Sequence, residues 1–75
     1  LYKIGRYEAA LLELDDLVKT YQTDSKLYEM RGTVLDRLGR TELALKSWNQ
    51  ALRFNPSNNS LKKFIERKQA RALAG

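Results

Sequence analysis

The sequence predicts an all-α fold, an α-solenoid fragment built from antiparallel helix–turn–helix repeats. The first observation is a fixed offset of 34 residues between two similar segments. The recurring residues are Leu1, Gly5, Arg6, Glu8, Ala10 and Leu11, which return as Leu35, Gly39, Arg40, Glu42, Ala44 and Leu45. A fixed period of about 20 to 50 residues is the signature of stacked repeats. The second observation is apolar spacing of three or four residues, and the third is the placement of glycine and proline between the apolar segments.

The chain begins inside this repeating pattern, because Leu1 takes the place that Leu35 takes one period later. We therefore expect a piece of a longer protein that starts in a helical stub and leaves that stub at Gly5. Seventy-five residues form at most one small domain. We expect residues 1–75 to divide into a partial repeat over 1–24, a full repeat over 25–58 and a capping helix over 59–75.

The first long helix is expected over residues 7–21. Its apolar residues share one side at helical spacing: Tyr7, Ala10, Leu11, Leu14, Leu17, Val18 and Tyr21. The second is expected over 25–38, with Asp24 or Ser25 as its N-cap. Gly39 should end it in a conformation with positive φ. This second helix carries two apolar stripes, which predicts packing on two sides. The stripes are Leu27, Met30, Val34 and Leu38, and Tyr28, Gly32 and Leu35.

Two further helices are expected over residues 41–54 and 60–73. Pro56 stops the earlier one because it has no backbone N–H to continue the hydrogen-bond ladder. Asn59 or Ser60 is expected to cap the later one. The last segment holds five Lys or Arg and one Glu, so most of the net charge of +5 belongs to residues 59–75.

These residues resemble a tetratricopeptide repeat (TPR). The positions that carry the resemblance are Tyr28, Gly32, Leu35, Gly39, Ala44, Ala51 and Pro56, with Trp48 in the usual large aromatic position. Gln22 stands where the family has proline, and Thr41 where it has tyrosine. Small residues at Gly32, Ala44 and Ala51 imply a close approach of two helices, with Gly32 facing Ala44. Glu66 replaces the small residue in the last helix, which implies a solvent-facing cap with a polar outer side.

The resemblance implies a concave groove that binds a peptide or a helix of another protein. The implied lining residues are Lys26, Glu29, Thr33, Asp36 and Arg37, followed in the next layer by Ser60, Lys63, Arg67 and Arg71. A subtype of the family that grips a C-terminal carboxylate has Asn at the position of Met30, and Lys and Arg at those of Ser60 and Phe64. The chain lacks all three, so we do not expect that specificity.

We expect no enzymatic activity, because the chain has neither His nor Cys. The densest carboxylates are Glu13, Asp15 and Asp16. Neighbouring side chains on a helix project about 100° apart, so these should form a solvated face rather than a metal site. Ser25 with Lys26, and Ser60 with Lys63, are expected to be cap serines beside surface lysines. We also expect no cofactor and no small-molecule substrate.

Two alternative functions remain open at this stage. Homo-oligomerisation would cover Tyr7, Leu11 and Leu14, if an upstream helix that should pack on them is missing. Alternatively, the basic last helix would bind nucleic acid or another anionic surface. Nucleic acid is not expected, because Tyr7, Tyr28, Trp48 and Phe64 are spaced for core packing and leave no aromatic residue for base stacking. No apolar run reaches the roughly 18 residues that span a membrane. The sequence does not distinguish compartments.

Overall fold

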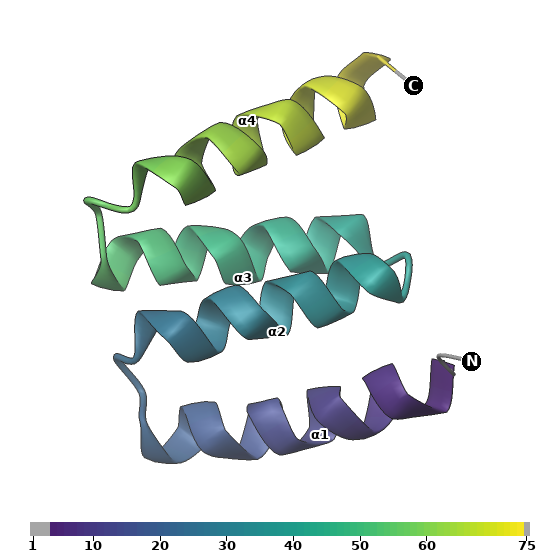
Figure 1. Ribbon diagram of the computed structural model, residues 1–75, viewed down its shortest axis with the longest axis vertical. Coiled ribbons are helices and arrows are strands. Elements are labelled where there is room, and N and C mark those ends of the chain that lie inside the picture. The colour runs from purple at the N-terminus through teal and green to yellow at the C-terminus, as the bar shows by residue number, and fades with distance from the viewer. Residues whose placement is uncertain (1–3, 75) are drawn as a thin grey trace.

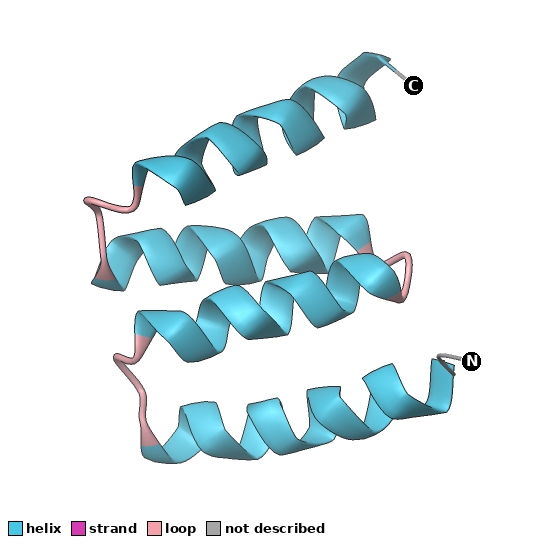
Figure 2. Ribbon diagram, viewed as in Figure 1, coloured by secondary structure: helices cyan, strands magenta, loops and turns pink. Residues whose placement is uncertain are grey.

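The computed structural model describes residues 4–74, which form four α-helices and, within that range, no strand (Figure 2). The helices are α1 (Ile4–Thr20), α2 (Ser25–Arg37), α3 (Thr41–Phe54) and α4 (Asn59–Ala74). The expected all-α class is therefore confirmed. The helical stub expected at the start of the chain falls on residues 1–3, outside the described residues.

The helices follow one another in a row and alternate in direction (Figure 1). Among the described residues, the backbones of helices that follow one another in the chain pack closely, whereas α2 and α4 meet through side chains such as Asp36 and Lys68. The closest pair is α2 and α3. The molecule is a slab that extends 30 Å and 29 Å along its two long axes and 17 Å along the short one. As a result, α1 and α4 form the two outer edges of the row.

Local hydrogen bonds explain where α2 begins and ends. The Asp24 carboxylate accepts a hydrogen bond from the backbone N–H of Lys26 at 3.0 Å, which makes Asp24 the N-cap. At the other end Gly39 has a φ of 80°. The N–H groups of Gly39 and Arg40 donate to the carbonyls of Asp36 and Leu35 at 3.0 and 2.9 Å. This paired arrangement is a Schellman motif, so the expected glycine cap at residue 39 is confirmed.

The start of α4 corrects an expectation. The Asn58 side chain, rather than that of Asn59 or Ser60, accepts from the N–H of Leu61 at 3.1 Å. Asn59 is already the first helical residue. The segment offers three consecutive candidate cap residues, and the structure selects Asn58, whose side chain makes the cap hydrogen bond. The end of α3 at Phe54 agrees with the expectation.

Gly5 does not end a helix, contrary to the expectation from its 34-residue relation to Gly39. It lies within α1, and it does not have a positive φ. Gly5 and Gly39 occupy equivalent positions of the 34-residue period but have different backbone conformations. A glycine permits a left-handed conformation but does not require one, and the contacts around it decide.

The core lies between α2 and α3 and extends to α4. Its buried residues are Leu35, Ala44, Trp48, Ala51, Leu61 and Ile65. The close helix contact is at Gly32, but it faces Trp48 rather than Ala44. A Cβ built on Gly32 would lie 2.3 Å from Trp48 Cδ1. The missing side chain lets the indole lie against α2, where its Nε1 donates to the Glu29 carbonyl at 3.2 Å.

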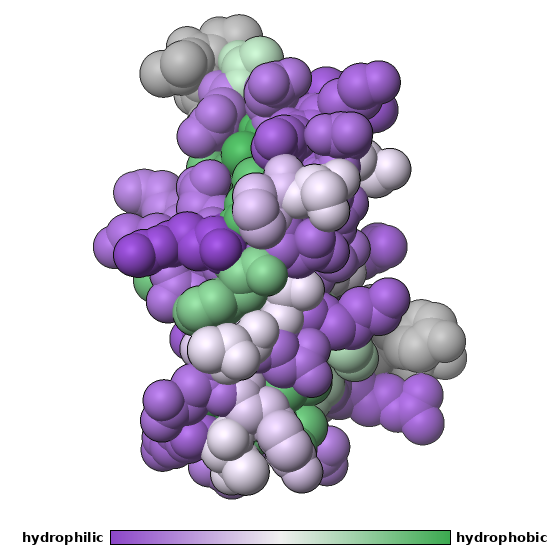
Figure 3. All heavy atoms as spheres, turned by 90° about the vertical axis from the view of Figure 1, so that its left-hand side faces the viewer, coloured by the Kyte–Doolittle hydropathy of each residue, from purple (hydrophilic) through white to green (hydrophobic). Residues whose placement is uncertain are grey.

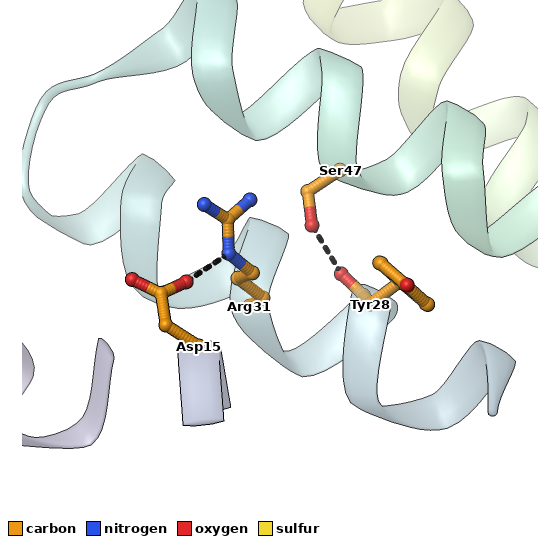
Figure 4. Close-up of polar contacts among 4 residues, drawn as sticks. All are labelled: Asp15, Tyr28, Arg31 and Ser47. Carbon is orange, nitrogen blue, oxygen red and sulfur yellow. Dashed lines mark hydrogen bonds and ion pairs between the residues drawn. The ribbon is translucent and has the colours of Figure 1, made fainter. Parts of the chain in front are cut away.

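Polar contacts connect α2 to both neighbouring helices (Figure 4). The buried Ser47 hydroxyl of α3 donates to the Tyr28 carbonyl of α2 at 2.8 Å. On the side of α1, Arg31 Nε donates to the Asp15 carboxylate. Arg40, just after α2, pairs with Glu8 at 3.2 Å. Of the three carboxylates expected to form a solvated face, Asp15 therefore has a structural role as part of an ion pair between α1 and α2.

Candidate functional site between α2 and α4

Side chains of α2 and α4 border an open hollow of about 290 Å³, with Trp48 of α3 in its wall. The other lining residues are Glu29, Thr33, Ser60, Leu61 and Phe64. Glu29 and Thr33 lie one helical turn apart on α2, and Ser60 and Phe64 have the same spacing on α4. The hollow thus joins one turn of each helix across the edge of the core.

The polar lining of this hollow is already organised by hydrogen bonds. Asn58 Nδ2 donates to Glu29 Oε1 at 3.3 Å, and the Thr33 hydroxyl donates to the Glu29 carbonyl at 3.2 Å. The apolar part of the lining comes from Leu61, Phe64 and the Trp48 ring. Such a mixture of a held carboxylate and an aromatic wall suits a side chain with an apolar body and a polar end.

The structure brings some of the implied groove residues together and separates others. Glu29, Thr33 and Ser60 line the hollow. Asp36 forms an ion pair with Lys68 at 3.1 Å, so its charge is balanced within the chain. Arg67 and Arg71 line a second hollow of about 400 Å³ along α4, together with Phe64, Lys68 and Ala70. Lys26, Arg37 and Lys63 are exposed and border neither hollow.

The aromatic residues only partly match the expected core role. Trp48 is buried, and Tyr7 and Tyr28 are half-buried. Phe64 packs edge-on against Trp48 with 4.8 Å between ring centroids, yet 38% of it is exposed. Lys68 Nζ lies 5.7 Å from the centre of its ring. Phe64 therefore belongs both to the core and to the candidate binding surface.

A larger hollow, of about 650 Å³, lies between α3 and α4 and was missed by the sequence reasoning. Lys46, Arg53 and Lys62 line it, with Asn49, Gln50, Leu52 and Pro56. Side chains two or five residues from Trp48 project well away from it around a helix, so Lys46 and Arg53 lie on the other face of α3. The seven-residue spacing of Lys46 and Arg53 places both on one face of α3, and this spacing is visible in the sequence. That Lys62 of α4 lies beside them becomes apparent only in the structure.

The residues expected to be left uncovered on α1 are largely covered. Leu14 is only 5% exposed, and Leu11 packs against the core. Tyr7 is half-buried. The premise that these three need an outside cover is therefore wrong for Leu14 and Leu11, because they face α2. The large apolar residues that are exposed in this part of the molecule are instead Leu12 and Leu17 of α1, Tyr21 just after α1, and Met30 of α2.

Other surface features concern metal sites, membrane spans and apolar patches. Among the described residues, no three acidic side chains are grouped closely enough to share a metal ion. Within residues 4–74, no helix combines the length and the apolar composition needed to cross a membrane.

Figure 3 views the molecule from the side of the 21–24 and 55–58 turns, where hydrophobic patches are small and separated by hydrophilic side chains. This face therefore presents no broad apolar surface.

Comparisons with family models, with curated proteins and with solved structures found no match to this chain.

Proposed function

We propose that the chain is a helical-repeat module of the TPR kind that binds a segment of another protein without catalysing a reaction. The binding surface is the α2–α4 groove, defined as Glu29, Thr33, Ser60 and Phe64 with Arg67 beside them. The observation that carries the proposal is the hollow between α2 and α4, which the first helix of each successive pair borders. A repeat that places equivalent helices side by side makes an extended surface of this kind.

The packing supports the repeat part of the proposal. The described helices follow one another in a row, and close backbone packing occurs between neighbours in the chain, which is typical of a stack of repeats. The 34-residue offset relates Gly32, which lies under Trp48, to Glu66, which is exposed. It also relates Tyr28 and Leu35, on the side of α2 that faces α3, to the exposed Lys62 and Gln69. The outer side of α4 is thus polar at the positions where α2 needs packing residues, as a capping helix requires.

The charges around the groove indicate the chemistry of its partner. Lys68 balances Asp36, and Asn58 binds Glu29, whereas Lys63 and Arg67 are exposed. We infer a partner segment, either extended or helical, with one apolar side chain for Phe64 and Leu61 and an Asp or Glu nearby. Charge complementarity of this kind mainly speeds encounter and fixes register. The retained carboxylates in the groove disfavour nucleic acid, whose phosphates they would repel.

A displayed peptide library selected on the immobilised chain would test this function. We expect selected peptides to combine an apolar residue with Asp or Glu, and to shift the amide resonances of α2 and α4 around Thr33 and Phe64. The double variant Lys63→Glu with Arg67→Glu should weaken binding, and the loss should shrink at high salt.

The matched control for this test is Lys46→Glu with Arg53→Glu, which reverses two charges on the other face of α3. This pair should leave peptide binding nearly unchanged. If the control pair proved the sensitive one, and the shifted resonances surrounded Lys46 and Lys62, the binding surface would be the α3–α4 hollow and the groove assignment would be wrong.

A further inference from the structure

The α3–α4 hollow is lined by three cations and by no carboxylate. Lys46 and Arg53 come from α3, and Lys62 comes from α4. All three are exposed, and among the described residues none of them forms an ion pair. The carboxylates of the same two helices, Glu42 and Glu66, do not line the hollow. The positive charge of this hollow is thus not balanced within the described part of the chain.

The 34-residue offset relates this hollow to positions on α1 and α2 that carry a different charge pattern. The hollow has Lys46, Asn49, Gln50, Arg53 and Lys62 where the earlier layer has Leu12, Asp15, Asp16, Lys19 and Tyr28. The later layer therefore has two carboxylates fewer and two cations more. Asp15 balances Arg31 of α2, whereas the residue that corresponds to Arg31 is the buried Ile65. No ion pair between helices explains the charges of the α3–α4 hollow.

The hollow lies inside the row of helices, because both of its walls are neighbours in that row (Figure 1). Helices α1 and α3, which are one period apart, do not pack on each other within residues 4–74. A hollow of about 250 Å³, lined by Tyr28 and Arg31 of α2 with three residues of α3, remains open although α2 has a helix on each side. An open hollow on this side is thus a feature of the row itself and not of its ends.

Three cations around one hollow suit an anion with more than one charge. A phosphate monoester carries a charge of about −1.5 to −2 at pH 7 and has three strong acceptor oxygens. Arg53 can bind two of these oxygens at once, and lysine adds a flexible point charge. Lys46 and Arg53 lie two turns apart, about 10 Å along the helix axis. Gln50 lies between them, and its side-chain amide is a further donor that makes no hydrogen bond among the described residues.

The neutral part of the lining favours a protein segment as the source of the phosphate. No aromatic residue lines the hollow, so a nucleobase would have no ring on which to stack. Charge-driven docking on an anionic membrane typically uses a cluster of roughly four to eight basic residues, more than the hollow supplies. Its apolar part consists of Leu52 and Pro56. That small area suits the backbone or a short side chain next to a phosphorylated residue.

We propose that the α3–α4 hollow binds a phosphorylated Ser or Thr of a partner protein segment, with Lys46, Arg53 and Lys62 around the phosphate. This surface lies on the other face of α3 from the α2–α4 groove, so the proposal does not depend on the proposed function. It gives the chain a second binding surface, whose occupancy depends on phosphorylation of the partner.

The test titrates the chain with a short synthetic peptide that carries one phosphoserine between Gly and Ala residues. We expect saturable shifts of the amide resonances around Gln50 and Lys62, and none with the unphosphorylated peptide. Binding should weaken severalfold between about pH 7.5 and 5.5, because the phosphate takes up its second proton near pH 6. The chain has no histidine to titrate in this range. A peptide with Glu in place of phosphoserine should bind more weakly and lack this pH dependence.

Two charge reversals of equal size make the result specific to this hollow. Lys46→Glu with Arg53→Glu should weaken phosphopeptide binding about tenfold or more, because opposed charges are replaced by like charges. Lys63→Glu with Arg67→Glu changes the net charge equally on the groove side, and screening by salt should keep its effect within about twofold. Asn49→Asp with Gln50→Glu restores the carboxylates of the first layer. This exposed or half-buried pair should also abolish binding while the helicity measured by circular dichroism is retained.

Several outcomes would overturn the proposal. One is the absence of saturable binding, and another is an equal loss in the two charge-reversal variants. Inorganic phosphate that binds as tightly as the phosphopeptide would show that the peptide adds nothing. Tighter binding to vesicles of anionic lipid or to a single-stranded oligonucleotide, lost on Lys46→Glu with Arg53→Glu, would assign the hollow to a membrane or a nucleic acid instead.

Discussion

Gly32 shows how a single missing side chain sets the distance between two helices. The Trp48 indole occupies the space where a Cβ would be, and it reaches the Glu29 carbonyl across the helix. Glycine in a helix interior costs about 0.5–1 kcal/mol relative to alanine, so the sequence retains it here against its helix propensity. The packing of the largest core side chain outweighs that local cost.

We predict that Gly32→Ala lowers the free energy of unfolding by about 1–3 kcal/mol, because the added methyl group displaces the indole. Gly5→Ala is the matched control. A Cβ there would meet nothing within 4 Å, so this substitution should stabilise α1 by its better helix propensity. Urea midpoints of the two variants measure the difference. A midpoint for Gly32→Ala at or above that of the unmodified chain would contradict the packing at Trp48.

Gly39 is the other glycine with a conformational role. Its φ of 80° lies in the left-handed region. We predict that Gly39→Ala lowers the free energy of unfolding by about 1–2 kcal/mol, because a Cβ is strained there. Thermal unfolding followed by circular dichroism measures the loss. Gly39→Asn should recover part of the stability, since Asn tolerates this region better than Ala.

At the scale of the elements, Asn58 both caps the start of α4 and contacts Glu29 of the groove. Its Oδ1 caps the helix, and its Nδ2 donates to Glu29. The two contacts connect the start of α4 to α2. Asn58 therefore stabilises both the first turn of α4 and its position beside α2.

We predict that Asn58→Ala lowers the stability of α4 by about 1 kcal/mol, since a side-chain cap is lost. Amide hydrogen exchange should show faster exchange in the first turns of α4, with α1 unaffected. Asn59→Ala should have a much smaller effect, because Asn59 is helical and is not the cap. Asn58→Asp should retain the cap but place a second carboxylate beside Glu29. If Asn59→Ala proved the more damaging change, the cap would be wrongly assigned.

At the scale of the whole molecule, burial is unevenly distributed along the row of helices. The buried residues of α2 and α3 are Gly32, Leu35, Ala44, Ser47, Trp48 and Ala51. In contrast, α1 contributes Leu14, and α4 contributes Leu61 and Ile65. In a row of helices whose close packing is mainly between neighbours, local stability follows these local contacts.

We predict that amide protection under native conditions is highest in α2 and α3 and lower in α1 and α4. The reason is that each outer helix is held on one side only. Native-state hydrogen exchange in dilute denaturant would measure the free energy of opening for each helix. Equal protection in all four helices would indicate a single cooperative unit instead.

The candidate site could be anticipated only in part. Glu29, Thr33 and Ser60 meet at one hollow as the repeat spacing implies, because residues one turn apart on parallel-stacked helices recur on one side. The ion pair of Asp36 with Lys68 and the cluster of Lys46, Arg53 and Lys62 could not be anticipated in the same way. Both features depend on which turns of α2, α3 and α4 become adjacent. Long side chains such as Lys and Arg can also adopt several conformations across such a contact, so their partners do not follow from spacing alone.

The sequence by itself determined the four helices, their order and most of their ends, because periodicity, caps and proline act within a few residues of one another. Asp24, Gly39 and Phe54 lie where local rules place a start or an end. Tertiary structure alone decided that Gly5 is helical, that Gly32 lies under Trp48, and that Leu14 is covered while Leu17 is not. Those outcomes depend on which neighbour is present on each side, and local propensity carries no information about a neighbour that is distant in sequence.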